Sequence, residues 1–176
     1  MKLKKAIFLD RDGVINKERG EYTYKIKDFV LNVGVIEALQ QFTEEKYLLI
    51  IITNQSGIAK GIYTHSDVKK LHEYMLELFR VKGINITAIY YCPHHPDIGK
   101  CLCRKPGSLL IEKTIARFNI DPKQSYFIGD KDRDIVAGKA AGVRGILIPA
   151  NSPILNALCK THPLPLSERG IEHSDS

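Results

Sequence analysis

The sequence contains no tryptophan, only two methionines and no apolar run long enough to cross a bilayer. A membrane-spanning helix needs about 20 consecutive apolar residues, so no membrane-embedded segment is expected. The segment Met1–Lys5 leads into only a short apolar run, which ends at Asp10. That pattern does not fit a secretion signal. These absences predict a cytoplasmic protein with no membrane partner.

The net charge is +6, yet the basic residues are spread along the 176-residue chain and form no block. Basic blocks and aromatic-rich motifs are typical of nucleic-acid-binding proteins, so a small anionic substrate is the better interpretation of the positive charge. A composition of 44% apolar and 26% charged residues indicates a folded globular chain. The length favours one domain, which we place at residues 1–150 and expect to be monomeric. We expect residues 151–176 to form a loosely packed tail.

Continuous apolar runs separated by helical patterns predict the fold. Such runs are typical of strands that are covered on both faces of a parallel sheet. The five expected strands are Ala6–Leu9, Leu48–Ile52, Ile86–Tyr90, Tyr126–Ile128 and Ile146–Ile148. The first of four expected helices follows Gly34, and the second opens at Thr64 and closes at Gly83. The third runs from about Ser108 to Phe118, and the fourth covers Asp132 to Ala141. This alternation predicts a doubly wound, mainly parallel α/β sheet, whose ligands bind at the carboxyl ends of the strands.

Two acidic motifs follow predicted strands. Asp10 and Asp12 are separated by one residue and precede Gly13, which permits a tight turn. One carboxylate of such a pair can attack an electrophile while the other transfers a proton. Asp130 follows another strand, so it lies at the same edge of the predicted sheet. Carboxylates gathered there suit Mg²⁺, which binds phosphate oxygens as well.

Groups that can bind phosphate oxygens occur between these acidic motifs. The second strand is followed by Thr53-Asn54-Gln55-Ser56-Gly57, a run of hydroxyl and amide side chains. Arg104 and Lys105 precede a predicted helix, whose N-terminal amides also attract anions. Taken singly, each motif is an ordinary polar turn or basic pair. Their order along the chain, which is acid pair, hydroxyl, cation and acid, is far more specific.

Four potential metal ligands lie within twelve residues. Cys92-x-His94 and Cys101-x-Cys103 supply three thiolates and one imidazole, a set that closes a tetrahedral structural zinc site. His95 is an alternative imidazole ligand, although the Cys-x-His spacing favours His94. Buried thiols or a disulfide are the other interpretations. Crowding of this kind in a reducing compartment favours zinc, and no role is assigned to Cys159.

These motifs resemble those of the haloacid-dehalogenase superfamily of phosphotransferases. The match comprises Asp10-Arg11-Asp12-Gly13, Thr53, Lys105 and Gly129-Asp130. The segments Thr53–Ala59 and Tyr91–Pro106 further resemble the subgroup of heptose-bisphosphate phosphatases, which also includes histidinol-phosphate phosphatases. The resemblance implies a Rossmann-like fold without a cap domain, a catalytic Mg²⁺ and a structural Zn²⁺ held by the loop 92–103.

The resemblance also implies a role for each matching residue. Asp10 would be the nucleophile that forms an aspartyl-phosphate, and Asp12 would protonate the leaving oxygen and then activate water. Thr53 and Lys105 would hold phosphoryl oxygens. The implied magnesium ligands are Asp10, the backbone carbonyl of Asp12, and Asp130. The implied substrate-binding residues are Arg11, Asn54, Gln55, Ser56, Arg104 and Lys131, with a further contribution from the loop around Glu18–Tyr22.

Three functions remain open at this point. The resemblance favours hydrolysis of one phosphate of a heptose bisphosphate, in the synthesis of nucleotide-activated heptose for surface polysaccharides. Hydrolysis of histidinol phosphate uses the same motifs and is the nearest alternative. A zinc-stabilised nucleic-acid-binding module is a distant third, because it leaves Asp10, Asp12 and Asp130 unexplained. We expect His65 and His72 to be solvated on a helix surface.

Overall fold

A computed structural model describes residues 2–155 of the chain. Its core is a five-stranded parallel sheet in the order β3-β2-β1-β4-β5. The strands are β1 (Ala6–Leu9), β2 (Leu48–Asn54), β3 (Ile86–Cys92), β4 (Tyr126–Gly129) and β5 (Arg144–Leu147). The helices are α1 (Val35–Glu44), α2 (His65–Arg80), α3 (Leu109–Phe118) and α4 (Asp132–Ala140), with short 3-10 turns η1 (Ile26–Asp28) and η2 (Pro122–Gln124). The predicted alternation of strands and helices is confirmed.

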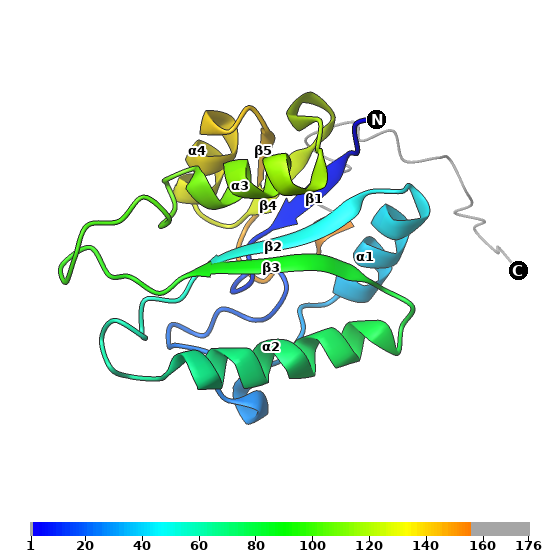
Figure 1. Ribbon diagram of the computed structural model, residues 1–176. Coiled ribbons are helices and arrows are strands. Elements are labelled where there is room, and N and C mark those ends of the chain that lie inside the picture. The colour runs from blue at the N-terminus through cyan, green and yellow to red at the C-terminus, as the bar shows by residue number, and fades with distance from the viewer. Residues whose placement is uncertain (1, 156–176) are drawn as a thin grey trace, which may run out of the picture.

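Helices cover both faces of the sheet, with α1 and α2 on one face and α3 and α4 on the other (Figure 1). Alternate residues of β1 explain this arrangement. Ile7 and Leu9 join the apolar cluster that includes the buried side chains of α1 and α2. Phe8 joins the cluster that includes residues of α3 and α4. Because strand side chains point alternately to opposite faces, a continuous apolar run is what such a two-sided core requires.

The ends of α2 follow the predicted local chemistry. The Thr64 hydroxyl accepts a hydrogen bond from the amide of Asp67, and the Asp67 carboxylate accepts one from the amide of Thr64. This reciprocal capping satisfies amides that the first helical turn cannot pair. At the other end, Gly83 has φ +73°, and the next amide bonds back to the carbonyl of Phe79. Such a left-handed glycine ends helices in general.

The strands β2, β3 and β4 extend one or two residues beyond the carboxyl ends of their apolar runs, and β5 begins before its run. β2 includes Thr53 and Asn54, which pair in register with Tyr91 and Cys92 of β3. Hydrogen bonds between the two strands therefore hold these polar residues at the carboxyl end of the sheet. β5 begins at Arg144 and ends one residue earlier than predicted. It is an edge strand with exposed positions, so its apolar run marks only part of its length.

Within residues 2–155, no helix combines the length and the apolar character that a membrane crossing needs. The described part of the chain also has no separate cap domain, because all its strands belong to one sheet and all four helices flank it. The predicted tail lies almost wholly outside the described residues, as does Cys159. The division at residue 150 stays a prediction.

Candidate active site and metal-binding loop

A cavity of about 520 Å³ lies at the carboxyl edge of the sheet. Residues from the ends of β1, β2 and β4 meet there with the loop that follows β1. Its lining residues are Asp10, Asp12, Glu18, Gly20, Glu21, Tyr22, Thr23, Thr53, Asn54, Ser56, Arg104, Asp130, Lys131 and Arg133. The sheet topology thus gathers the acidic motifs, the hydroxyl motif and the basic motif at one edge. The loop around Glu18–Tyr22 contributes four of its five residues to the lining, and its role near the substrate stays a prediction.

Lys105 lies in a buried cluster of charges beneath the cavity. Its ammonium is 2.9 Å from Asp10 Oδ1 and 2.7 Å from Asp134 Oδ1, and it donates to the carbonyl of Ile52 at 2.8 Å. All three charged side chains are at most 5% exposed. Since isolated buried charges are costly, the ammonium and the two carboxylates stabilise one another. Lys105 is therefore held beside the predicted nucleophile.

Burial changes the protonation behaviour of Asp10. Loss of solvent raises the pKa of Asp10 to about 7, although Lys105 opposes the shift. Asp134 and Asp12 add to the rise, because nearby negative charges disfavour another one. The pKa of Asp130 is also raised, again chiefly by burial. A cation bound beside these carboxylates would oppose both shifts and favour their ionised forms.

The carboxylates of Asp10, Asp130 and Asp134 offer oxygens that all lie within 4.8 Å of one another. Asp130 Oδ2 is buried without a hydrogen-bond donor, although Lys131 Nζ is 3.2 Å away. An all-oxygen set of closely spaced carboxylates fits a hard cation such as Mg²⁺. Gly13 makes this packing possible, because a Cβ at its position would lie 2.5 Å from Asp130 Oδ2 and its φ is +86°.

Asp12 is held by three side chains. Arg11 Nη2 donates to both of its oxygens at 2.9 Å, Asn16 Nδ2 donates at 2.9 Å, and Gln55 Nε2 donates at 3.1 Å. Arg11 and Gln55 are almost wholly buried and do not line the cavity. Both side chains contact Asp12 instead, and their contact with substrate stays a prediction. Tyr63 in turn donates to Gln55 Oε1 at 2.7 Å.

The hydroxyl motif divides into cavity-facing and supporting residues. Thr53 and Ser56 line the cavity. Asn54 also does, and its side chain both accepts from the amide of Lys105 at 3.1 Å and donates to the carbonyl of Lys105 at 3.2 Å. This pair of bonds fixes the lysine backbone to the end of β2. Asn54 thereby couples the hydroxyl motif to the basic motif.

The predicted zinc ligands converge in the loop that follows β3. Cys92, His94, Cys101 and Cys103 offer ligand atoms that all lie within 4.8 Å of one another. Cys92 Sγ lies 3.6 Å from His94 Nδ1, 3.7 Å from Cys101 Sγ and 3.3 Å from Cys103 Sγ. Tetrahedral ligands at zinc distances are about 3.5–3.8 Å apart, so the cluster fits zinc. Sulfur separations this long exclude a disulfide between Cys92 and either cysteine. His95 instead lies against Asp97.

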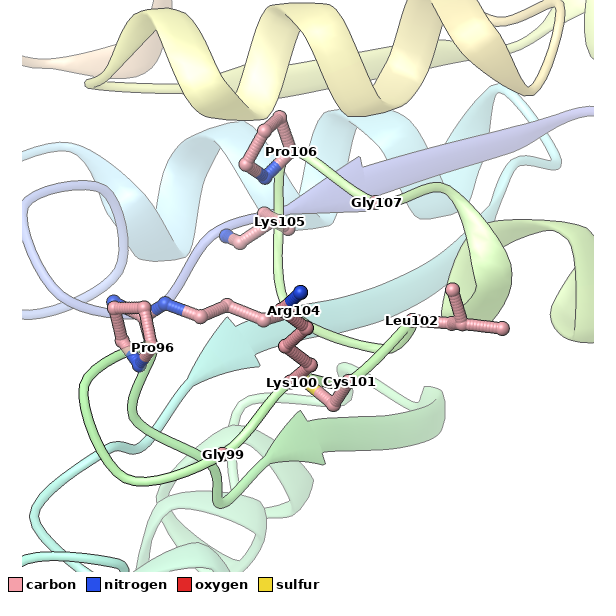
Figure 2. A pocket seen from close by; sticks show the side chains of 9 residues that line it. All are labelled: Pro96, Gly99, Lys100, Cys101, Leu102, Arg104, Lys105, Pro106 and Gly107. Atoms are coloured by element: carbon pink, nitrogen blue, oxygen red, sulfur yellow. The ribbon is translucent and has the colours of Figure 1, made fainter.

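The same loop delivers Arg104 to the cavity. Its side chain extends across the loop toward Pro96 and donates to the carbonyl of His94 at 3.2 Å (Figure 2). A second, more apolar cavity of about 700 Å³ lies on this side of the loop, where Leu102 is 78% exposed. Arg104 borders both cavities. Folding of the loop therefore sets the position of a cation at the edge of the site.

Some residues of the site were not predicted as such. Asp134 belongs to the carboxylate cluster, and its position four residues after Asp130, in the first turn of α4, was the available signal. Arg133 lines the cavity without a distinguishing motif. The expectation that His72 is solvated is wrong. It is 7% exposed, because its side of α2 packs toward Arg11. His65 is exposed, as expected.

Comparisons with known proteins agree with this site. The HAD-hydrolase-like family model matches residues 102–152. D-glycero-beta-D-manno-heptose-1,7-bisphosphate 7-phosphatase of Pasteurella multocida is 43% identical over 86% of this chain and 85% of its own. D-glycero-alpha-D-manno-heptose-1,7-bisphosphate 7-phosphatase of Campylobacter jejuni is 48% identical over 84% and 83%. The structure of D,D-heptose 1,7-bisphosphate phosphatase from B. bronchiseptica complexed with magnesium and phosphate superposes with a TM-score of 0.78, at 29% identity, over 89% and 86%.

The parallel sheet and the carboxylates at its edge define a phosphoric monoester hydrolase of the HAD-like class. Within that class, the chain belongs to the family of heptose-1,7-bisphosphate 7-phosphatases.

Proposed function

We propose that this chain removes the 7-phosphate from D-glycero-D-manno-heptose 1,7-bisphosphate in a Mg²⁺-dependent reaction. The observation that carries the proposal is the arrangement of charges in the strand-edge cavity. A buried Asp10 lies beside Lys105, and Arg104, Lys131 and Arg133 line the same cavity. A substrate with a second, remote phosphate gives these three cations a ligand. The relatives named above carry this activity in their names.

The proposed chemistry has two steps. Asp10 attacks phosphorus, so that a bond forms between its carboxylate oxygen and phosphorus while the bond to the sugar oxygen breaks. Asp12 gives its proton to that leaving oxygen. In the second step Asp12 takes a proton from water, whose oxygen attacks the phosphorus of the aspartyl-phosphate, and inorganic phosphate and free Asp10 result. Lys105 and Thr53 hold the phosphoryl oxygens throughout.

Both metals belong to this proposal. Magnesium would be held by carboxylate oxygens of Asp10 and Asp130 and the carbonyl of Asp12, and when bound it offsets the repulsion between Asp10 and the phosphate. The closely spaced carboxylate oxygens of Asp10 and Asp130 support that assignment. Zinc would be structural, because four protein ligands leave no open position. We also propose a monomer in the cytoplasm.

One observation favours a second candidate. Glu18 and Glu21 line the cavity as well, and carboxylates suit the amine of histidinol phosphate better than a second phosphate. Steady-state kinetics with Mg²⁺ on both anomers of the heptose bisphosphate and on histidinol phosphate separate the two functions. We expect kcat/KM to be at least about tenfold higher for a heptose bisphosphate, and ³¹P NMR to show a product that retains its 1-phosphate. A higher kcat/KM for histidinol phosphate would overturn the proposal.

A further inference from the structure

The guanidinium of Arg11 is fully buried and forms a bridge. Its Nε and Nη2 donate to Asp12, and Nη2 also donates to the carbonyl of Thr23 at 2.6 Å. The remaining nitrogen, Nη1, lies 3.3 Å from Nε2 of His72. Among residues 2–155, His72 is the only hydrogen-bond partner found for Nη1. Arg11 therefore connects α2 to Asp12.

His72 is suited to accept this hydrogen bond. Burial lowers its pKa to about 3, and the positive charge of Arg11 adds to the effect. The ring is therefore neutral at working pH, with a lone pair free on one nitrogen. Its position is fixed from a second side, because it packs edge-on against Tyr91 with ring centroids 5.9 Å apart. A neutral, immobilised acceptor next to a buried guanidinium is what the geometry requires.

We propose that His72 is a positioning residue, which accepts a hydrogen bond from Arg11 Nη1 and so orients the Asp12 carboxylate for proton transfer. The guanidinium is planar and its donors have a fixed geometry. An acceptor at Nη1 therefore sets the plane in which Nε and Nη2 meet the carboxylate. His72 touches neither Asp12 nor the cavity lining, so it acts only through Arg11. The inference rests on the proposed function, in which Asp12 is the acid and base.

Loss of this acceptor has a specific kinetic consequence. A buried guanidinium N–H without a partner is unfavourable, so Arg11 turns to find another acceptor and Asp12 loses its orientation. The proton from Asp12 matters most when the leaving group is a poor one, such as a sugar alkoxide. It matters little for p-nitrophenolate, which leaves without being protonated. A defect in orientation of Asp12 therefore depends on the leaving group.

The test uses His72→Leu, which removes the acceptor, and His72→Gln, whose amide oxygen can replace Nε2. His65→Leu is the matched control, because His65 belongs to the same helix and contacts Tyr91, but not Arg11. We expect His72→Leu to lower kcat/KM, which reports the first step and not the shared hydrolysis of the aspartyl-phosphate, about 10- to 100-fold on the sugar phosphate and less than about threefold on p-nitrophenyl phosphate. His72→Gln should recover most of the loss, and His65→Leu should match the wild type on both substrates. Circular dichroism of each variant reports its folding.

Three results overturn the inference: equal losses of His72→Leu on the two substrates, no loss on either, or no recovery in a folded His72→Gln. Asp12→Asn is measured in parallel to separate this inference from the proposed function. If Asp12→Asn shows no dependence on the leaving group, the role of Asp12 fails and the role of His72 fails with it. If the loss in Asp12→Asn depends on the leaving group and the loss in His72→Leu does not, only the role of His72 is wrong.

Discussion

Lys105 is tightly constrained by its neighbours. Its ammonium is 1% exposed and contacts two carboxylates and a carbonyl. Removing one partner from a buried ion pair costs about 3–5 kcal/mol, so a neutral residue here would leave Asp10 and Asp134 as uncompensated charges. Lys105 therefore stabilises the fold beside the predicted nucleophile, Asp10. Asp12 lines the cavity and its side chain is 24% exposed, so its substitution separates catalysis from stability better.

His72 also predicts a pH dependence of stability. Its pKa is about 3 in the folded protein and about 6.5 when unfolded. As the pH falls below 6.5, the unfolded chain takes up a proton that the folded chain does not, so stability is lost at acidic pH. Between pH 7 and pH 5, the wild type should lose about 2 kcal/mol more unfolding free energy than His72→Gln. Urea titrations at both pH values measure this difference, and parallel losses in the two proteins would show that His72 is not buried as described.

At the scale of helices and strands, local sequence chemistry predicted most of the architecture. The apolar runs identify β1, β2 and β4 because both faces of these strands are buried. The run of β3 also identifies its strand, although β3 lies at an edge of the sheet and its inner positions are only half-buried. The capping residues Thr64 and Asp67 mark the start of α2. The loop at residues 92–103, which we call the ligand loop, was predictable for a similar reason, since its four potential metal ligands are close in sequence. The bounds of β5 were less predictable, because this edge strand has both buried and exposed residues.

Contacts between distant segments were not predictable in this way. Arg11 and His72 are 61 positions apart in the sequence, and their pairing depends on how α2 packs against the turn after β1. The inward positions of Arg11 and Gln55 likewise follow from three-dimensional packing around Asp12. A motif places a residue at the sheet edge, yet it does not say whether the side chain faces the cavity or the core. Residues of both kinds therefore received the same predicted role.

The ligand loop carries its own prediction. Cys101→Ser removes one of the four proposed zinc ligands. The variant should purify without zinc, whereas the wild type should contain about one zinc per chain. Because zinc binding contributes folding free energy to such loops, Arg104 and Lys105 should lose their fixed positions. KM should rise and kcat should fall together. His95→Ala is the matched control, since His95 is adjacent to the cluster but outside it. Elemental analysis and kinetics give the readout, and a zinc-free Cys101→Ser with wild-type kinetics would contradict the structural role.

For the molecule as a whole, the carboxyl ends of the strands bring together side chains that are far apart in the sequence, from Asp10 to Asp134. The parallel topology places the ends of β1, β2 and β4 side by side, so Asp10, Thr53 and Asp130 face one cavity. The described chain has no cap domain, so the loop around Glu18–Tyr22 and the ligand loop form the walls. Asn151 holds the first of these walls, accepting from the amide of Glu18 at 2.7 Å and donating to its carbonyl at 3.0 Å. Substrate selection is thus assigned to loops and catalysis to the sheet.

The central claim is that the carboxylate of Asp10 receives the phosphoryl group. Asp12→Asn should still be phosphorylated by a substrate with a good leaving group, while the acyl-phosphate it forms is hydrolysed slowly. Acid quenching followed by peptide mass spectrometry locates the phosphoryl group. The account predicts a phosphorylated peptide that contains Asp10, and no such peptide from a folded Asp10→Asn, whose turnover should fall by about 10⁴-fold or more. A phosphoryl group on another residue, or turnover by Asp10→Asn at the wild-type rate, would contradict it.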